Sequence, residues 1–301
     1  MANDHGILLE SGTGELEILE FKVGNAYYAI NVIKVREILN IEKYTKLPNS
    51  KKSVHGISEV RGEVVTLIDL KFVLDGIKEE LDDSVMTLLC EFNQMKVAFT
   101  VDKVLGIHRI GWDVIQKPDD LVKNALVIGN INYDGRILML LDFERIVMDI
   151  APETGITENR LGELEERDRS GVKLVLADDS PTIRQVLKDV LIKAGYKNLT
   201  FFDDGEKALN YLYELLDKKG EKINEEVNLV ITDIEMPQLD GHTFTRKIKE
   251  DKILKNLPVV IFSSLITKEL KHKGEDVGAD AQLSKPQVGE LVEAVDRLVF
   301  K

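Results

Sequence analysis

The stretch Leu176-Ala177-Asp178-Asp179-Ser180 decides the fold of the C-terminal half, together with Thr232-Asp233-Ile234-Glu235-Met236-Pro237 and Ser284-Lys285-Pro286. Short apolar runs of the kind that form strands precede them, at Val172–Leu176, Leu229–Ile231 and Ala281–Leu283. Because ligand sites of parallel sheets lie beyond the carboxyl ends of the strands, residues that directly follow neighbouring strands meet at one edge. The sequence therefore predicts three carboxylates and a lysine, side by side at one edge of a sheet.

These residue types suit a divalent cation and a phosphoryl group. Mg²⁺ prefers oxygen ligands and keeps several waters, so two or three carboxylates are enough to hold it. A hydroxyl pair, Ser263-Ser264, follows a further strand-like run at Val259–Phe262. The alternative for the acid pair is helix capping, since Ser180-Pro181 is typical of an N-cap followed by proline at the first helical position. Four strand ends that supply an acid pair, an acid, a hydroxyl and a lysine favour the shared site.

Amphipathic helix patterns alternate with these strands, at Pro181–Lys193, Glu206–Leu216, Gly241–Lys249, Lys268–Val277 and Gly289–Val299. Five such units predict an α/β domain, a (βα)5 doubly wound parallel sheet with helices on both faces. The charged stretch at 217–226 is expected to be a solvated loop. His242 and His272 fall in helix patterns and are expected on the surface.

The N-terminal half has the texture of an all-β domain. Short alternating runs separated by turn signals occur at Leu16–Val23, Tyr27–Ile30, Gly62–Leu70, Met86–Phe92, Val97–Val101, Leu126–Asn130 and Arg136–Leu141. Many short strands with regular turns predict a sandwich or barrel, so the chain is multidomain. One helix is expected, at Val32–Leu39. His55 and His108 are expected to stand alone, and no catalytic constellation is visible in this half.

Composition excludes several classes of function. The chain has 301 residues, enough for two domains, and a net charge of −13. Neither half has the basic footprint of a nucleic-acid binder. No apolar run approaches the roughly 20 residues of a membrane span, so we expect no membrane insertion. The N-terminus lacks the pattern of a signal peptide, and the single cysteine, Cys90, is expected in the core, so a cytoplasmic location is expected.

A polar stretch separates the two halves. Residues 151–170 contain Pro152, Gly155 and Gly162 and only isolated apolar residues. This composition is typical of a linker. We therefore expect a first domain over 13–150, a linker over 151–170 and a second domain over 171–301.

The second domain closely resembles the receiver domain of bacterial two-component response regulators, a flavodoxin-like fold of the CheY type. The acid pair, Asp-x-x-Met-Pro-x-x-Asp-Gly from Asp233, the hydroxyl and Lys285-Pro286 occur in order. The resemblance implies that Asp233 accepts a phosphoryl group and that Asp178, Asp179, Asp233 and the backbone carbonyl of Glu235 hold Mg²⁺. It implies that Ser263 and Lys285 contact phosphoryl oxygens and that the Lys285–Pro286 bond is cis. Gln282 stands where many receivers carry an aromatic switch residue.

The first domain resembles the chemotaxis coupling protein CheW. Val35-Arg36-Glu37-Ile38, Arg61-Gly62 after Gly56-Ile57, and Val65-Thr66-Leu67-Ile68-Asp69-Leu70 carry the resemblance. It implies that Arg61, Gly62, Val35 and Glu37 face a partner, a chemotaxis histidine kinase or methyl-accepting chemoreceptors. The alternative for Arg61 is an ordinary turn residue before Gly62, and the apolar members of the set are as well explained by core packing.

A coupling domain followed by a receiver is the layout of the CheV-type chemotaxis proteins. The resemblance implies a cytoplasmic adaptor at chemoreceptor clusters that couples receptors to the kinase and is modulated by phosphorylation of Asp233, and not a dedicated enzyme. One alternative is a phosphate sink that drains phosphoryl groups from the kinase. Another is a metal-dependent phosphohydrolase with Glu235 as the general acid, which the complete receiver motif disfavours.

Overall fold

The computed structural model describes residues 15–78, 85–92, 95–116, 118, 126–152, 156, 161–162, 166–236, 238–264 and 268–300. Pro237 and much of the predicted linker lie outside these residues. The chain forms two compact units, one of residues 15–152 and one of the described residues from 156 to 300. No helix of the described part is long and apolar enough to cross a membrane.

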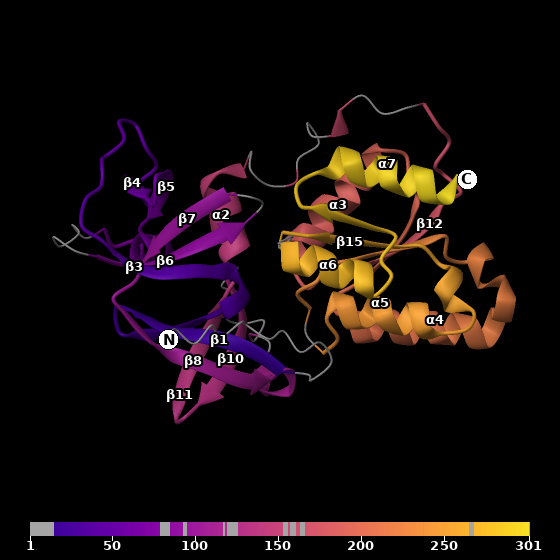
Figure 1. The fold of residues 1–301 in the computed structure, drawn as a ribbon, viewed down its shortest axis with the longest axis horizontal. Coiled ribbons are helices and arrows are strands. Elements are labelled where there is room, and N and C mark those ends of the chain that lie inside the picture. The colour runs from indigo at the N-terminus through magenta and orange to yellow at the C-terminus, as the bar shows by residue number, and fades with distance from the viewer. Residues whose placement is uncertain are drawn as a thin grey trace. The chain divides into compact units, whose positions relative to one another are not determined.

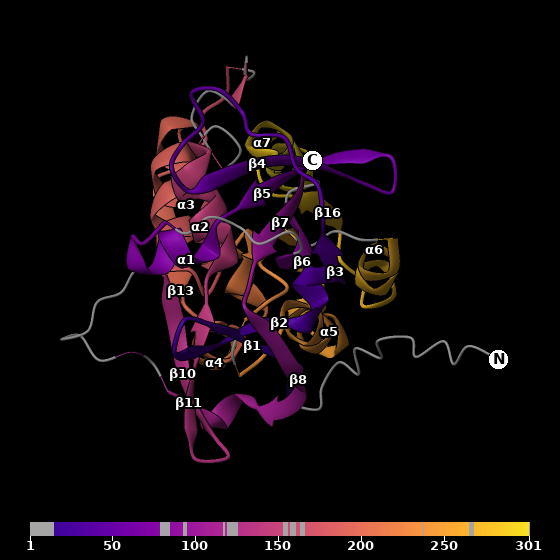
Figure 2. The same cartoon turned by 90° about the vertical axis from the view of Figure 1, so that its left-hand side faces the viewer.

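The N-terminal unit is built from two β-sheets, which confirms the predicted all-β domain. Their strand orders are β8-β1-β2-β11-β10-β9 and β3-β6-β7-β5-β4. Neighbouring strands are antiparallel except β2 with β11 and β5 with β7. In Figure 1 the second sheet lies above the first, and the β10–β11 hairpin extends downward in both Figures 1 and 2. The strands are β1 (Glu15–Val23), β2 (Ala26–Asn31), β3 (Val35–Ile41), β4 (Val54–Val60), β5 (Glu63–Ile68), β6 (Val85–Phe92), β7 (Met95–Thr100), β8 (Lys103–Gly111), β9 (Ile115–Gln116), β10 (Val127–Tyr133) and β11 (Arg136–Leu141).

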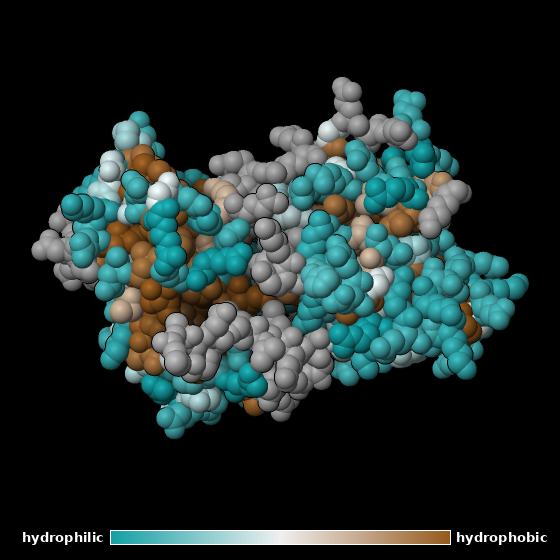
Figure 3. Space-filling view, viewed as in Figure 1, coloured by the Kyte–Doolittle hydropathy of each residue, from teal (hydrophilic) through white to brown (hydrophobic). Residues whose placement is uncertain are grey.

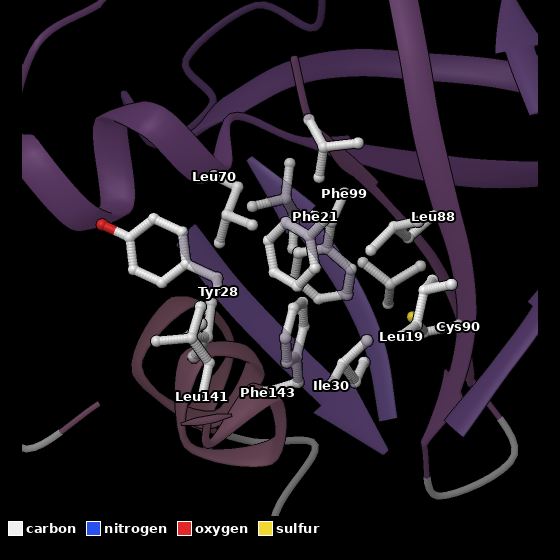
Figure 4. Close-up of a cluster of buried hydrophobic side chains, with 14 of the residues drawn as sticks. Leu19, Phe21, Tyr28, Ile30, Leu70, Leu88, Cys90, Phe99, Leu141 and Phe143 are labelled. Carbon is white, nitrogen blue, oxygen red and sulfur yellow. The ribbon is translucent and has the colours of Figure 1, made fainter. Parts of the chain in front are cut away.

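One apolar cluster joins the two sheets of this unit. It takes Phe21 from β1, Phe99 from β7 and Phe143 from a short helix, and the rings of Phe99 and Phe143 meet edge to face at 4.8 Å (Figure 4). Full burial of a side chain of this size contributes about 1.5–3 kcal/mol. Cys90 lies in the same cluster, as predicted, and burial raises the pKa of its thiol.

The predicted helix over Val32–Leu39 is wrong. A single 3-10 turn, η1 (Val32–Lys34), is followed by strand β3, on which more and less exposed residues alternate. This period of two, with the β-branched Val35 and Ile38, is typical of a half-buried strand. Val35 and Glu37 therefore lie on a strand.

Two short helices of this unit were not predicted, α1 (Leu70–Asp75) and α2 (Phe143–Ile150). Each begins after an aspartate whose side chain accepts a backbone N–H of the first turn. Asp69 accepts from Phe72 at 2.8 Å, and Asp142 accepts from Arg145 at 2.9 Å. These N-caps satisfy donors that a helix start otherwise leaves without partners.

The C-terminal unit confirms the predicted (βα)5 fold. Its parallel sheet has the order β13-β12-β14-β15-β16, with β12 (Lys173–Ala177), β13 (Asn198–Phe202), β14 (Leu229–Thr232), β15 (Val259–Ser263) and β16 (Ala281–Ser284). The helices are α3 (Pro181–Lys193), α4 (Gly205–Lys219), α5 (Gly241–Glu250), α6 (Lys268–Asp276) and α7 (Val288–Val299). In Figure 1, α3 and α7 cover one face of the sheet and α4, α5 and α6 the other. The next strand in the chain, β13, lies on one side of β12, and β14 to β16 lie on the other side. Ligand sites of such sheets lie at the carboxyl ends of the strands, at the place where the strand order reverses.

The stretch at 217–226 is helical, which corrects the predicted solvated loop. Helix α4 continues to Lys219, and a 3-10 segment, η5 (Gly220–Glu225), follows directly. Ile223 is fully buried in the core beneath it. Outside, Glu226 pairs with Lys173 and Lys219 at 3.0 and 2.7 Å. One buried isoleucine among charged residues anchors the segment.

Candidate functional site

The acid pair lies in the turn between β12 and α3. Asp178 is 2% exposed, and its Oδ1 accepts the backbone N–H of Ser180 at 2.9 Å. Ser180 caps α3, since its Oγ accepts from Ile183, and Pro181 occupies the first turn. Because Ser180 fills the capping position, the capping alternative does not account for Asp179.

A residue that the sequence analysis missed holds this turn from the helix side. The Arg184 guanidinium donates through Nη1 to the backbone carbonyls of Asp178 and Asp179, at 2.6 and 2.8 Å. The two carbonyls therefore face the helix. The position of Arg184 in the sequence could have indicated this contact. Arg184 begins the second turn of α3, and side chains of a helix tilt toward its N-terminus, so this residue lies over the loop that precedes the helix.

The carboxylate of Asp233 follows β14 and is almost fully buried. Its Oδ1 accepts the backbone N–H of Ile234 at 2.6 Å, and its Oδ2 accepts from Lys285 at 2.9 Å. Helix α5 begins against this residue at Gly241, where a Cβ would lie 1.9 Å from the Asp233 carbonyl oxygen. Only glycine permits so close an approach, which explains the Asp-Gly at the end of the motif.

Carboxylates of Asp178, Asp179 and Asp233 converge, as the sequence predicted. Each offers an oxygen, and these oxygens all lie within 4.8 Å of one another. Lys285 Nζ bridges the cluster, 2.6 Å from Asp178 Oδ2 and 2.9 Å from Asp233 Oδ2. Three carboxylates against one ammonium leave an excess of negative charge, and all the donors are hard oxygens. The residues present therefore fit Mg²⁺.

Ser263 and Lys285 reach the same edge from adjacent strands. Ser263 is fully buried and stands opposite Ser284 in the β15–β16 register, and its carbonyl accepts the backbone N–H of Lys285 at 3.0 Å. The Lys285–Pro286 bond is cis. Glu235, in the loop two residues after Asp233, is partly buried.

In the N-terminal unit, Arg61 and Gly62 form the two-residue turn between β4 and β5. Their φ angles are +52° and +83°, the left-handed values that tight hairpin turns require. The Arg61 side chain is 78% exposed and donates to Glu37 Oε1 of β3 at 2.7 Å. The structure thus brings two of the predicted partner-binding residues together.

The same sheet also carries exposed apolar residues. Ile38 of β3 is 43% exposed, which favours the interface alternative over core packing for this residue. Val64 of β5 is 69% exposed and was not predicted. Figure 3 shows apolar surface on this unit between its two sheets. Val35, by contrast, is partly buried against the central cluster, which favours its packing interpretation.

The histidines agree with their predictions only in part. His55 Nε2 lies 3.2 Å from Asp69 Oδ2, and His108 Nε2 lies 2.7 Å from Glu20 Oε2, so neither stands alone. His242 is 1% exposed between α5 and α6, where burial lowers the pKa of its imidazole to about 4. His272 is exposed, as predicted.

Two sequence families match the two units. The CheW-like domain matches residues 17–151 and the response regulator receiver domain matches residues 174–296. The chemotaxis protein CheV3 of Helicobacter pylori is 28% identical over 302 residues, which cover 95% of this chain and 96% of that protein. CheV1 of the same species is 25% identical over 308 residues, 95% and 94% of the two chains. The chemotaxis protein CheW of Thermotoga maritima is 26% identical over 145 residues, 47% of this chain and 94% of that one.

Proposed function

Because the two halves of this chain belong to the CheW-like and response regulator receiver families, joined in the order of the CheV-type proteins, we propose that it is a chemotaxis adaptor. Its CheW-like domain couples chemoreceptors to a histidine kinase, and phosphorylation of Asp233 modulates that coupling. The protein works in the cytoplasm at chemoreceptor clusters, binds no nucleic acid and is not a dedicated enzyme.

One observation carries the phosphoryl-acceptor half of the proposal. Lys285 holds Asp178 and Asp233 together from two different strands, with the Asp179 carboxylate beside them. A carboxylate oxygen of Asp233 attacks the phosphorus atom, the bond from phosphorus to the donor breaks, and its electron pair leaves with the donor. Such a transfer depends mainly on positioning and charge neutralisation.

The roles of the remaining residues follow from their charge. Asp178, Asp179, Asp233 and the Glu235 carbonyl would hold Mg²⁺, which supplies positive charge opposite the phosphoryl oxygens when bound. Lys285 is a point charge for one phosphoryl oxygen, and the Ser263 hydroxyl donates to another. The buried Asp178–Lys285 pair keeps this charge in place beforehand.

Recognition of partners falls to the N-terminal unit. The sheet that carries the Arg61–Glu37 pair also carries the exposed Ile38 and Val64, and arginine together with apolar surface is common at interface centres. We propose that this surface meets the kinase or the receptor tip.

A reconstitution tests the proposal. Receptor, kinase and the full chain are combined with Mg²⁺, with and without a small acyl phosphate, and kinase activity and label on the chain are measured. We expect label on the wild-type chain, none on Asp233→Asn, and a change in kinase activity that Asp233→Asn does not show. A phosphate sink would instead give label on the chain with no change in kinase activity. In that case Arg61→Glu would leave both the label and the kinase activity unchanged.

A further inference from the structure

Lysines without a carboxylate among them lie in the loop between β3 and β4. We call residues 43–53 the lysine loop, and its charged residues, all exposed, are Lys43, Lys46, Lys51 and Lys52. The exposed Lys78, which follows α1, donates from Nζ to the backbone carbonyl of Lys52 at 3.0 Å. Positive charge thus gathers in and beside one loop of a chain whose net charge is −13. The acidic stretch 79–83, next in the sequence, lies outside the described residues.

Backbone contacts hold the lysine loop against the edge strand β4. Thr45 forms a bridge with Ile57 through two hydrogen bonds, of 2.8 and 2.9 Å. The Ser58 hydroxyl donates to the carbonyl of Lys43 at 2.7 Å. Gly56 permits this approach, since a Cβ there would lie 2.2 Å from the Thr45 carbonyl oxygen. The lysines therefore extend from a fixed backbone, so their charges are kept at one end of the sheet.

None of these ammonium groups has a carboxylate partner within the described part of the chain. Burial lowers the pKa of the nearby His55 imidazole, and Asp69 opposes this shift. Lys78 and Lys46 lower the pKa further, so their positive charges reach the same buried ring. Like charges gathered without counter-charges repel one another in the free protein. A local conflict of this kind is typical of a functional surface.

Apolar side chains accompany the lysines. Leu47 is 39% exposed and stands directly before a turn at Pro48 and Asn49, where Asn49 has a φ of +57°. Ile77, next to Lys78, is 55% exposed. Exposed aliphatic side chains with charges around them resemble the core and the rim of a protein interface.

The lysine loop and the Arg61 surface lie at opposite ends of one strand. The loop directly precedes β4, and Arg61 directly follows it. Seven residues of extended chain separate the two ends by about 20 Å. An adaptor that couples two proteins needs two such surfaces, and the Arg61 surface supplies one of them.

The chemistry of the loop favours an acidic protein over a nucleic acid or a membrane. Lysine is a flexible point charge, whereas the planar fork of arginine suits phosphates and bases in fixed geometry. Tyr44, the aromatic residue of the loop, is half-buried with its ring 6.3 Å from that of His55, so it offers no free face to stack a base. An anionic membrane would face and repel the rest of the acidic chain, whereas an acidic patch of a protein can meet the loop alone.

We propose that the lysine loop, with Leu47, Ile77 and Lys78, is a second docking surface of the CheW-like unit. It receives an acidic protein segment that carries apolar side chains. The inference rests on the proposed function and deepens it, because it assigns this segment to whichever of kinase and receptor does not meet the Arg61 surface. The adaptor then holds its two partners at the two ends of β4.

Association kinetics of the full chain test this surface. Kinase and receptor are immobilised separately, and the association rate constant is measured at several salt concentrations. Lys43→Glu/Lys46→Glu/Lys52→Glu reverses three charges and removes no side-chain hydrogen bond or ion pair of the described residues. For one partner we expect the rate constant at low salt to fall on the order of tenfold and its salt dependence to flatten, because exposed charges steer association.

Two matched variants separate the loop from net charge. Lys103→Glu/Lys222→Glu/Lys247→Glu makes the same change of charge at exposed lysines elsewhere, and its rate constants should stay near those of the wild type. A triple Lys→Gln variant at the three loop positions should lie between the wild type and the charge reversal. Arg61→Glu should weaken binding to the other partner only.

The outcomes decide between the claims. A wild-type chain that binds neither kinase nor receptor overturns the proposed function itself. Binding to both partners that the loop variant leaves unchanged overturns the second surface, as does an equal loss in the control triple. Loss of binding to the same single partner in the loop variant and in Arg61→Glu overturns the division between two partners. If the loop variant loses only binding to phosphatidylglycerol vesicles, the occupant is a membrane and the proposal of an acidic protein is wrong.

Discussion

Lys285 joins the two strand-end carboxylates of the site: its Nζ lies 2.6 Å from Asp178 Oδ2 and 2.9 Å from Asp233 Oδ2, and its side chain is 2% exposed. Asp178 and Asp233 follow β12 and β14, which are neighbours in the sheet. A buried lysine thus offsets part of the negative charge where the strands end.

Replacing Lys285 by methionine should destabilise the metal-free receiver by about 3–5 kcal/mol, because it leaves buried carboxylates without their cation. Mg²⁺ should recover much of this loss, since it binds the folded site and not the unfolded chain. The free energy of unfolding, measured by denaturant titration with and without Mg²⁺, checks this. Equal destabilisation in both conditions would show that the cation does not occupy this site.

Arg184 should position the acid pair. Arg184→Gln removes the guanidinium that holds the carbonyls of Asp178 and Asp179, so we expect Mg²⁺ affinity to fall on the order of tenfold, the effect typical of residues that orient metal ligands. Loss of a positive charge alone would raise the affinity for a cation, so the direction distinguishes positioning from charge. Arg184→Lys, which keeps donors and charge, is the control. Tighter Mg²⁺ binding in Arg184→Gln contradicts the positioning role.

Protonation of His242 should link receiver stability to pH. Burial lowers the pKa of its imidazole to about 4, an effect that Lys273 and Arg246 add to and Asp240 opposes. The folded state therefore binds fewer protons than the unfolded state, whose histidine titrates near 6.5. The stability that comes from the neutral, buried His242 imidazole is fully present above pH 6.5 and is lost as the pH falls toward 4. The free energy of unfolding falls by about 3 kcal/mol over this range.

The free energy of unfolding between pH 7 and pH 4 measures this contribution. His242→Gln carries no titrating ring, so its curve should be shallower than that of the wild type over this range. Parallel curves for the two proteins would mean that other groups cause the acid sensitivity.

An arginine in the predicted linker should stabilise the receiver. Arg169 is 4% exposed and binds Asp296 of α7 through two nitrogens, with Nη2 2.6 Å from Oδ2 and Nε 3.0 Å from Oδ1. Arg169→Met should lower the free energy of unfolding by about 3–5 kcal/mol, because among the described residues the Asp296 carboxylate then keeps only the Tyr196 hydroxyl as a donor. Arg169→Met with Asp296→Leu should recover most of this. The measurement is the midpoint of the receiver's unfolding transition, which is recognised as the transition that Mg²⁺ shifts. The same midpoint in Arg169→Met and in the wild type would contradict the prediction.

The receiver site could be predicted because one rule of parallel sheets determines it. Residues directly after β12, β14, β15 and β16 meet at one edge whatever the packing below them, so Asp178, Asp233 and Lys285 were found from spacing alone. The contact of Arg184 with the loop before α3, and that of Gln282 on β16 with the Lys271 carbonyl of α6, were not predicted. Each depends on where a helix lies against a loop or a strand, which spacing in the sequence does not determine.

The errors have a common physical origin in tertiary contacts. The pattern at 32–39 fits a helix as well as a strand, and pairing of β3 with β6 decides it. Ile223 lies among charged residues in sequence and His242 lies in a helix pattern beside Asp240, and only the packed structure shows that both are buried. The six-residue helix α1 is too short for its apolar period to be recognised.

The N-terminal unit should bind its partners by itself. It has its own core, so residues 1–150 should fold alone and bind the kinase–receptor assembly. Arg61→Glu should weaken this binding, because it places a carboxylate beside Glu37 and reverses the charge that a partner meets. Arg61→Asn is the matched control for the turn, since asparagine tolerates the positive φ of position 61 without a charge.

The charge swap Arg61→Glu with Glu37→Arg separates recognition from structure. The swap restores the ion pair within the unit but exchanges the positions of the two charges that a partner meets. We expect the swapped fragment to unfold at the wild-type temperature and still to bind at least tenfold more weakly, which corresponds to about 1.4 kcal/mol of binding free energy. If the swap restores binding, the pair serves only the hairpin. If the wild-type fragment has no affinity for kinase or receptor, the adaptor proposal fails and a phosphate sink takes its place.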